Sequence, residues 1–267
     1  MREPMRRAFA VFVVAMSFAL ASACGNRRSS ITVAGSTAFQ PFAEKLADQF
    51  MTVRPTANII VQGGGSAVGI QSTLSGTAQI GMADLVTLPE EAKGLRATEV
   101  ARDGIAVVVH PSNRINDLTM DQLRRIFSGS IRNWRDLGGS DGMITVVSRE
   151  AGSGTRISYE QIVGDLVLTK EAIVQDSNGT IRETVANDPN AVGYLSHGLL
   201  NEKIKAVTID GVACTNEAIQ SNQYVLARPI YLLIRGEPMP DTQAFIDYIL
   251  SAEGQQTLQS SGLIPVK

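Results

Sequence analysis

The chain has 267 residues, of which 44% are hydrophobic, and its formal net charge at pH 7 is −2. It lacks the basic excess of a nucleic-acid-binding protein, so we expect no nucleic-acid partner. His110 and His197 are the only histidines, and no Cys/His cluster has the spacing of a zinc site, so we expect no metal and no cofactor. The length fits one domain or two lobes.

The first 23 residues have the pattern of a secretory signal peptide. Three arginines precede the uncharged run AFAVFVVAMSFALASA, which is short for a transmembrane helix of roughly 20 apolar residues. The ending ASAC is similar to a lipobox, in which cleavage before Cys24 leaves that cysteine free for lipid attachment. We expect residues 24–30 to form a lipid-anchored tether, and ordinary cleavage near Ala23 is the alternative.

Cleavage after residue 23 removes three arginines and Glu3, which leaves 21 Lys and Arg against 25 Asp and Glu and a net charge of −4. An anionic ligand must then be attracted by a local field and not by net charge. Cys214 is the only cysteine besides Cys24, so we expect no intrachain disulfide. We expect an exported protein, located in a periplasm or on the outer face of the cytoplasmic membrane.

Strand and helix patterns alternate from residue 31 onward, which predicts an α/β fold with a mainly parallel sheet. Short β-branched or apolar runs predict strands at 31–35, 58–62, 78–84, 104–110, 143–148, 191–196 and 205–211. Periodic apolar residues predict helices at 36–50, 67–76, 118–129, 155–164 and 241–262. Pro41 suits the first turn of the first helix, and Leu118 belongs to the apolar side of the third.

Two long apolar runs are candidates for the chain to cross between lobes. Residues 104–113 end in a Pro-Ser-Asn break, and residues 224–236 are interrupted by Pro229. These crossings predict one lobe from 31–107 and 230–267 and a second from 108–229.

Three predicted strand–helix junctions share glycine and hydroxyl residues: GST at 35–37, GGGS at 63–66 and SREAGSGT at 148–155. Glycine lets a ligand approach the backbone, and a helix N-terminus offers unpaired N–H groups and partial positive charge to an anion. Ser and Thr can equally serve only as N-caps. Three such junctions favour a ligand site, because ligands of open α/β sheets bind beyond the carboxyl ends of the strands.

Two charged residues lie beside these junctions. Arg149 can hold two oxygens of a tetrahedral oxyanion, or it can form an ion pair with Glu150. Asp84 follows the strand at 78–84, and an ionised carboxylate only accepts hydrogen bonds. It therefore favours an oxyanion that still carries a proton, such as phosphate, and disfavours sulfate. The alternatives are that Asp84 caps the next turn or pairs with Arg149.

Several longer segments carry a specific resemblance. VAGSTAFQPFAEKLADQF, VQGGGSAVGIQSTLSGTAQIGMAD, IFSGSIRNW, SREAGSGTR and ARPIYLLIRGEP occur in the order seen in phosphate-binding proteins of the PstS type. These are the substrate-binding components of ABC phosphate importers. The resemblance covers nearly all of the chain after residue 23, and it implies a two-lobed, type II periplasmic-binding-protein fold with two hinge crossings.

The resemblance also implies a set of phosphate contacts. They are Thr37 and the amide of Ala38, with Ser36 as a further contact, then Ser66, Asp84, Arg149, Ser153, Gly154 and Thr155. Many relatives have an acid just before the glycine of GSGT, where this chain has Ala151 and where Glu150 is offset by one residue. The implied partners are inorganic phosphate, an ABC permease and an ATPase, with a monomeric protein held at the membrane by its lipid.

Other classes of function fit the sequence less well. A serine hydrolase needs the elbow G-x-S-x-G and a histidine base, and neither the segment around Ser66 nor that around Ser153 provides both. No P-loop is present, so transport would need a separate ATPase. A sugar-binding module would show aromatic platforms, yet Trp134 is the only tryptophan. A sulfate or molybdate binder, or a phosphate-sensing lipoprotein, remains the closest alternative.

Overall fold

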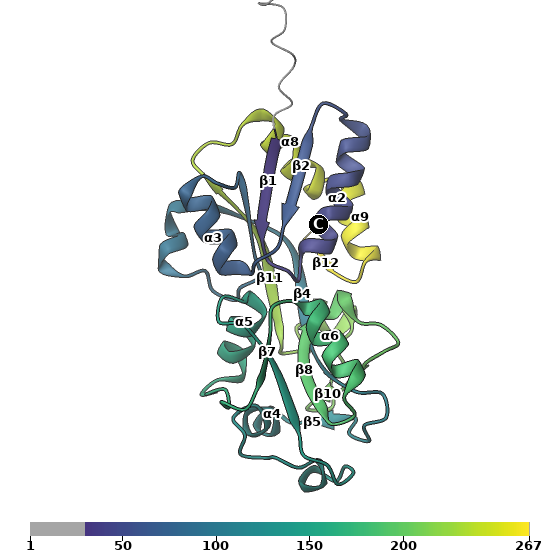
Figure 1. The fold of residues 1–267 in the computed structure, drawn as a ribbon. Coiled ribbons are helices and arrows are strands. Elements are labelled where there is room, and N and C mark those ends of the chain that lie inside the picture. Colours follow the sequence, from purple (N-terminus) through teal and green to yellow (C-terminus); the bar gives the residue numbers. More distant parts are fainter. Residues whose placement is uncertain (1–29, 267) are drawn as a thin grey trace, which may run out of the picture.

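The computed structural model describes residues 30–266, so the predicted signal peptide, Cys24 and residues 24–29 of the tether lie outside the described residues. The described chain forms two lobes, one above the other in Figure 1, and two long strands run from one lobe to the other. These strands are β4 (Leu95–Val109) and β11 (Ala227–Arg235). The predicted two-lobed α/β fold with two crossings is confirmed.

The first lobe is built on a mixed sheet in the order β2-β1-β3-β11-β4. Strands β1 (Ser30–Gly35), β2 (Asn58–Gln62) and β3 (Ile80–Ala83) are parallel, whereas β11 runs antiparallel to β3 and β4. The short β12 (Ile264–Pro265) pairs with β4. The sheet is thus parallel only where strand–helix–strand units build it, which is less than the sequence predicted.

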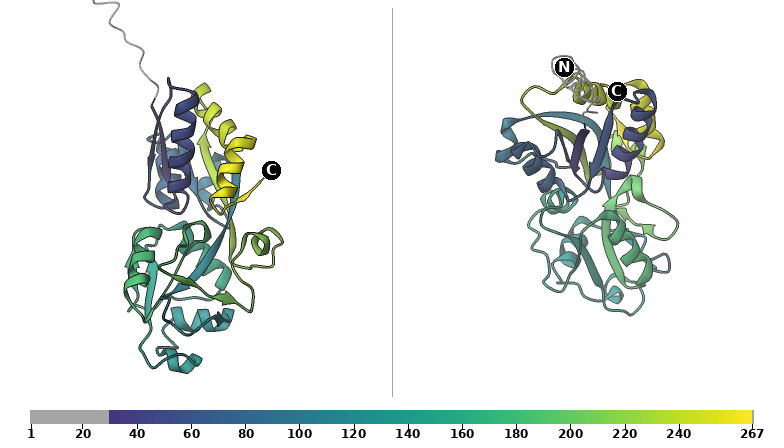
Figure 2. Two further views of the ribbon diagram at one scale, coloured as in Figure 1. Left: turned by 90° about the vertical axis from the view of Figure 1, so that its right-hand side faces the viewer. Right: turned by 45° about the horizontal axis from the view of Figure 1, so that its top comes forward.

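Helices cover both faces of this sheet (Figures 1 and 2). The helix α3 (Ser66–Ser75) packs on one face through Ile70, together with Leu233 of β11. The other face carries α2 (Gln40–Val53), α8 (Pro240–Leu250) and α9 (Ala252–Ser260). The predicted apolar stripe of Phe42, Leu46 and Phe50 is buried there, and Phe50 contacts Phe245 at 5.3 Å between ring centroids.

The second lobe continues the sheet in the order β4-β8-β6-β7, where β8 is Ala191–Ser196, β6 is Thr145–Arg149 and β7 is Ile173–Gln175. The strand β9 (Lys205–Ala206) pairs with β4, and β5 (Asp117–Leu118) and β10 (Thr208–Ile209) form a separate two-stranded sheet. Its helices are α4 (Met120–Phe127), α5 (Gly154–Val163), α6 (Asn178–Asn187) and α7 (Asn216–Gln220). Tyr159 and Tyr194 stack at 4.2 Å in its core, and Trp134 is buried nearby.

The sheet changes lobe within β4. Gly104 still pairs with Ala227 of β11, whereas Ile105 pairs with Ser196 of β8. Pro229 does not interrupt β11, because β3 pairs with β11 only at 231–233 and leaves the proline with one neighbouring strand. The residue bounds given above for the lobes remain a prediction.

Some predicted elements differ from the observed ones. The helix expected over 241–262 is two helices, because Ser251 ends α8 and caps α9. The strand expected over 205–211 is split into β9 and β10, and Leu118 lies in β5 and not in a helix. The elements β7, α6 and α7 were not predicted from the sequence. Three short 3-10 helices, Glu90–Gly94, Trp134–Leu137 and His197–Leu199, were also not predicted.

Gly35 ends β1 with a φ of 136°, and a Cβ at this position would overlap the backbone oxygen of Met82 and lie 2.9 Å from Cα of Gly69. We predict that Gly35→Ala lowers the free energy of unfolding by about 2–4 kcal/mol, since backbone atoms must move. Gly94→Ala is the matched control, because nothing lies within 4 Å of its added methyl group. Urea denaturation of both variants tests this, and equal stabilities would contradict it.

Cys214 is buried against Gly104 of the hinge strand. Burial raises the pKa of its thiol, and the negative charge of Asp103 raises it further. A raised pKa reduces the thiolate fraction at a given pH, so we predict alkylation at pH 8 to be at least roughly tenfold slower in folded than in unfolded protein. Mass spectrometry of a chain begun after Cys24 measures both rates, and similar rates would refute the prediction.

Candidate functional site

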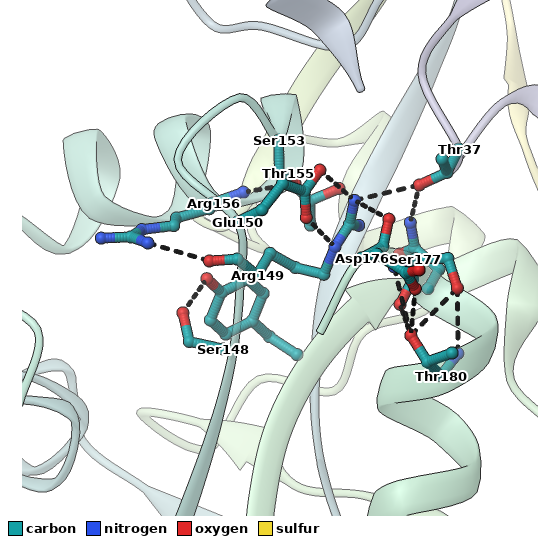
Figure 3. Close-up of polar contacts among 12 residues, drawn as sticks. Thr37, Ser148, Arg149, Glu150, Ser153, Thr155, Arg156, Asp176, Ser177 and Thr180 are labelled. Atoms are coloured by element: carbon teal, nitrogen blue, oxygen red, sulfur yellow. Dashed lines mark hydrogen bonds and ion pairs between the residues drawn. The ribbon is translucent and has the colours of Figure 1, made fainter. Parts of the chain in front are cut away.

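The three predicted junctions meet where the two lobes face each other. Thr37 follows β1, Ser66 begins α3 and the loop at 149–155 leads from β6 into α5. Figure 3 shows Thr37 at the tip of a first-lobe loop, opposite the side chains of the 149–155 loop. Parallel strands end at the same edge of a sheet, and the two lobes turn these edges toward each other.

Arg149 is the central cation of this region and is 1% exposed. Its Nε and Nη2 donate to Oε2 and Oε1 of Glu150, each at 2.8 Å, and Nη2 also lies 3.1 Å from Oγ1 of Thr37 (Figure 3). Its buried Nη1 has no hydrogen-bond partner among the described residues. The guanidinium is therefore fixed in a plane by a bidentate ion pair and keeps one nitrogen free for a ligand.

Glu150 provides an acid beside Arg149, although this chain has Ala151 at the position where many relatives have one. Although its place in the sequence is offset by one residue, its carboxylate contacts both Nε and Nη2 of Arg149. Both the ion-pair and the ligand interpretation of Arg149 are compatible with this geometry, because Nη1 is not used by Glu150.

Asp84 is the buried acceptor of the region and is also 1% exposed. Oγ of Ser66 donates to its Oδ1 at 2.6 Å, and Oγ1 of Thr155 donates to its Oδ2 at 3.1 Å. Nη2 of Arg228 lies 2.8 Å from the same Oδ2. Asp84 thus pairs with Arg228 and not with Arg149, and it joins the first-lobe hydroxyl to the second-lobe hydroxyl.

The remaining predicted site residues have different places. Oγ of Ser36 accepts from the amide of Phe39 within the turn before α2, and Oγ of Ser153, the N-cap of α5, accepts from the amide of Arg156. Ala38 is buried in the turn before α2. Gly154 lies against Ser66 and Asp84 so closely that a Cβ would overlap both side chains.

Sequence reasoning missed Asn178, the first residue of α6. Its Nδ2 donates to Oγ1 of Thr37 at 3.3 Å, its Oδ1 accepts from the amide of Ser196 at 3.0 Å, and its side chain is buried. The segment SNGT at 177–180 forms a capping box with Ser177 and Thr180. This box was the available signal for a fourth strand–helix junction.

Further hydrogen bonds hold the lobes together beside the charged residues. Oγ of Ser158 donates to the carbonyl of Asp84 at 3.1 Å and accepts from the amide of Val86 at 3.2 Å. The amide of Ala67 donates to the carbonyl of Gly152 at 3.1 Å. The lobes are therefore in contact across the site, which is the closed arrangement of a two-lobed binding protein.

The arrangement suits the binding of an anion better than hydrolysis. A buried guanidinium and the N-termini of α3, α5 and α6 converge on one region, and each helix start has unpaired N–H groups. In the described part of the chain neither histidine contacts Ser153, and His110 bonds to Ser112 instead. A serine nucleophile needs a neighbouring base, so Ser153 lacks the means of activation.

Comparison with known proteins agrees with this geometry. A family model described as a PBP superfamily domain matches residues 21–253. The phosphate-binding protein PstS of Bacillus subtilis is 33% identical over 278 residues, which cover 96% of this chain and 93% of that protein. The chain belongs to the PstS family. The PstS of Borreliella burgdorferi, 26% identical, is covered to 98% of its length and matches 96% of this chain.

Solved structures place the fold in the same family. One from Clostridium perfringens, assigned as a phosphate ABC transporter substrate-binding protein with bound phosphate, has a TM-score of 0.87 and 38% identity. The match covers 90% of this chain and all of that one. An ABC-type phosphate transport receptor from Vibrio cholerae has a TM-score of 0.74 and 33% identity, covering 88% and 99% of the two chains. The predicted PstS family membership is confirmed.

Proposed function

We propose that this PstS-family protein captures inorganic phosphate between its two lobes and delivers it to an ABC importer. The observation that carries the proposal is that Arg149, with a buried free nitrogen, and Asp84, a buried acceptor, both lie at the lobe interface. Relatives named as phosphate-binding proteins and a phosphate-bound neighbour support it. The protein is a binding protein and not an enzyme.

Charge recognition falls to Arg149 and to backbone amides. Nη1 of Arg149 donates to one phosphate oxygen, and the amides of the turn before α2 and of the starts of α3 and α5 donate to the others. The proposed contacts are Ser36, Thr37, Ala38, Ser66, Asp84, Arg149, Ser153, Gly154 and Thr155. Asn178 steadies Thr37 from the second lobe.

Selection among oxyanions falls to Asp84. An ionised carboxylate has about four lone-pair sites, and Ser66, Thr155 and Arg228 occupy three of them. The remaining site accepts the proton that phosphate carries at neutral pH. Sulfate and molybdate offer no proton there, and a buried pair of facing acceptors is costly, so the site disfavours both.

Delivery and location complete the proposal. We infer that the protein is exported, that Cys24 carries lipid, that the protein is monomeric and that permease and ATPase subunits complete the importer. The lobes 31–107 plus 230–267 and 108–229 close around the ligand, because contacts from both lobes favour the closed state. Among residues 30–266 no helix is long and apolar enough to cross a membrane.

Titration calorimetry of the chain begun after Cys24 tests the function, with Arg149→Ala as the decisive variant. We predict that wild-type protein binds phosphate and that this variant loses at least roughly a hundredfold in affinity, because the ligand loses its buried cationic partner. Arg124→Ala is the control, since the Arg124 side chain donates to the carbonyls of Val163 and Gly164 at the end of α5 and to Asp121, outside the site. Unchanged affinity in Arg149→Ala would place the site elsewhere.

Asp84→Asn tests the selection mechanism. The amide can donate as well as accept, so we predict that phosphate affinity falls roughly tenfold or more while sulfate begins to compete. The ratio of phosphate to sulfate affinity, measured by competition calorimetry, reports the effect. If that ratio equals the wild-type ratio, Asp84 does not read the proton of the ligand.

A further inference from the structure

Arg228 occupies a position that nothing in the chain's sequence pattern singled out. It lies near the start of β11, one of the two strands that join the lobes, and it is fully buried. A single nitrogen, Nη2, lies 2.8 Å from Oδ2 of Asp84 and 3.0 Å from Oδ2 of Asp103. An Nη2 group carries two N–H bonds, so it has one hydrogen for each carboxylate.

Asp103 ties this pair to the hinge. It lies on β4, the other strand that joins the lobes, and is 1% exposed. Its Oδ1 accepts from Oγ of Ser196 at 3.0 Å, and the amide of Ser196 donates to Asn178. Asn178 in turn contacts Thr37. The network therefore reaches from Asp84 through both hinge strands into the second lobe.

We propose that Arg228 is the positioning residue that fixes the Asp84 carboxylate in place as a hydrogen-bond acceptor and thereby sets the preference of the site for a protonated oxyanion. The inference rests on the proposed phosphate-binding function and deepens it. Arg228 acts on the ligand through Asp84, while Arg149 supplies the cation for the ligand itself.

Charge balance supports this role. Asp84 and Asp103 are two buried carboxylates, and the Arg228 guanidinium is the cation that contacts both. Burial raises the pKa of Asp103, the charge of Asp84 adds to the rise, and Arg228 opposes it. Without the arginine, the two neighbouring buried carboxylates have no cation between them and repel each other. An Asp84 side chain displaced by this repulsion no longer faces the ligand as a fixed acceptor.

Geometry supports it as well. Oδ2 of Asp84 receives Thr155 from the second lobe and Arg228 from the hinge, which fixes the carboxylate plane with its Oδ1 toward Ser66. A single nitrogen of Arg228 makes both ionic contacts, so the bidentate geometry of the guanidinium is not used. The ammonium group of a lysine can therefore make the same two contacts. Lysine is therefore the conservative variant, and methionine removes all donors.

The test compares Arg228→Met, Arg228→Lys and the control Arg124→Met by competition calorimetry with phosphate and sulfate. We expect Arg228→Met to lose roughly tenfold or more of phosphate affinity and to let sulfate compete. Arg228→Lys should restore most of the wild-type ratio of phosphate to sulfate affinity, and Arg124→Met should keep all of it. Loss of stability in Arg228→Met with a wild-type ratio would show a purely structural role and overturn the inference.

A second pair of variants keeps the test decisive if Arg228→Met does not fold. Asp103→Asn alone leaves Arg228 on Asp84, so the ratio should stay within about threefold of wild type. Arg228→Gln combined with Asp103→Asn removes one charge of each sign, and here the ratio should fall. An unchanged ratio in the double variant overturns the inference.

The two levels of the proposal fail in different ways. Wild-type protein that binds no phosphate overturns the proposed function and the inference together. Phosphate binding by the wild type, with a ratio of phosphate to sulfate affinity that is unchanged in the Arg228 variants, overturns the inference alone.

Discussion

The rest of this structure depends on the pairing of charged side chains that are buried at the lobe interface. Arg149, Asp84, Arg228 and Asp103 are each at most 1% exposed. Buried charges are costly unless each is paired and hydrogen-bonded. Every one of these four has an ionic partner at 2.8–3.0 Å, and the donors without partners are on the two arginines. The buried charges are thus paired with one another, and Nη1 of Arg149 is the donor that we assign to an anion.

These ion pairs and hydrogen bonds connect the proposed ligand site with the closing of the two lobes. Asp84 and Thr37 belong to strand ends of the first lobe, and Thr155 and Arg149 come from the second. Their contacts exist only while the lobes are closed. Arg228 and Asp103 lie on β11 and β4, where the sheet passes from one lobe to the other, so Asp84, the proposed acceptor for the ligand, is tied to the strands that join the lobes. A ligand that bridges the same groups stabilises closure by its additional contacts.

The sequence was informative where the chemistry is local. Gly-Ser-Thr junctions after β-branched runs marked Thr37, Ser66 and the 149–155 loop, because turn, cap and ligand approach all depend on neighbouring residues. The partners of Asp84 were a different matter. Arg228, which pairs with both Asp84 and Asp103, is separated from Asp103 by 125 positions. It lies in a run with the pattern of an ordinary apolar strand. Such long-range pairs follow from strand order, which local periodicity does not encode.

We propose that the site selects an oxyanion by its proton and not by its size. A displacement series at neutral pH tests this most directly, with phosphate bound and arsenate, sulfate, selenate and molybdate as competitors in calorimetry. We expect that arsenate, which is larger than phosphate but carries a proton, displaces it, whereas sulfate and selenate do not. Displacement by sulfate, or failure of arsenate to compete, would contradict the role of Asp84 as the acceptor that reads the ligand.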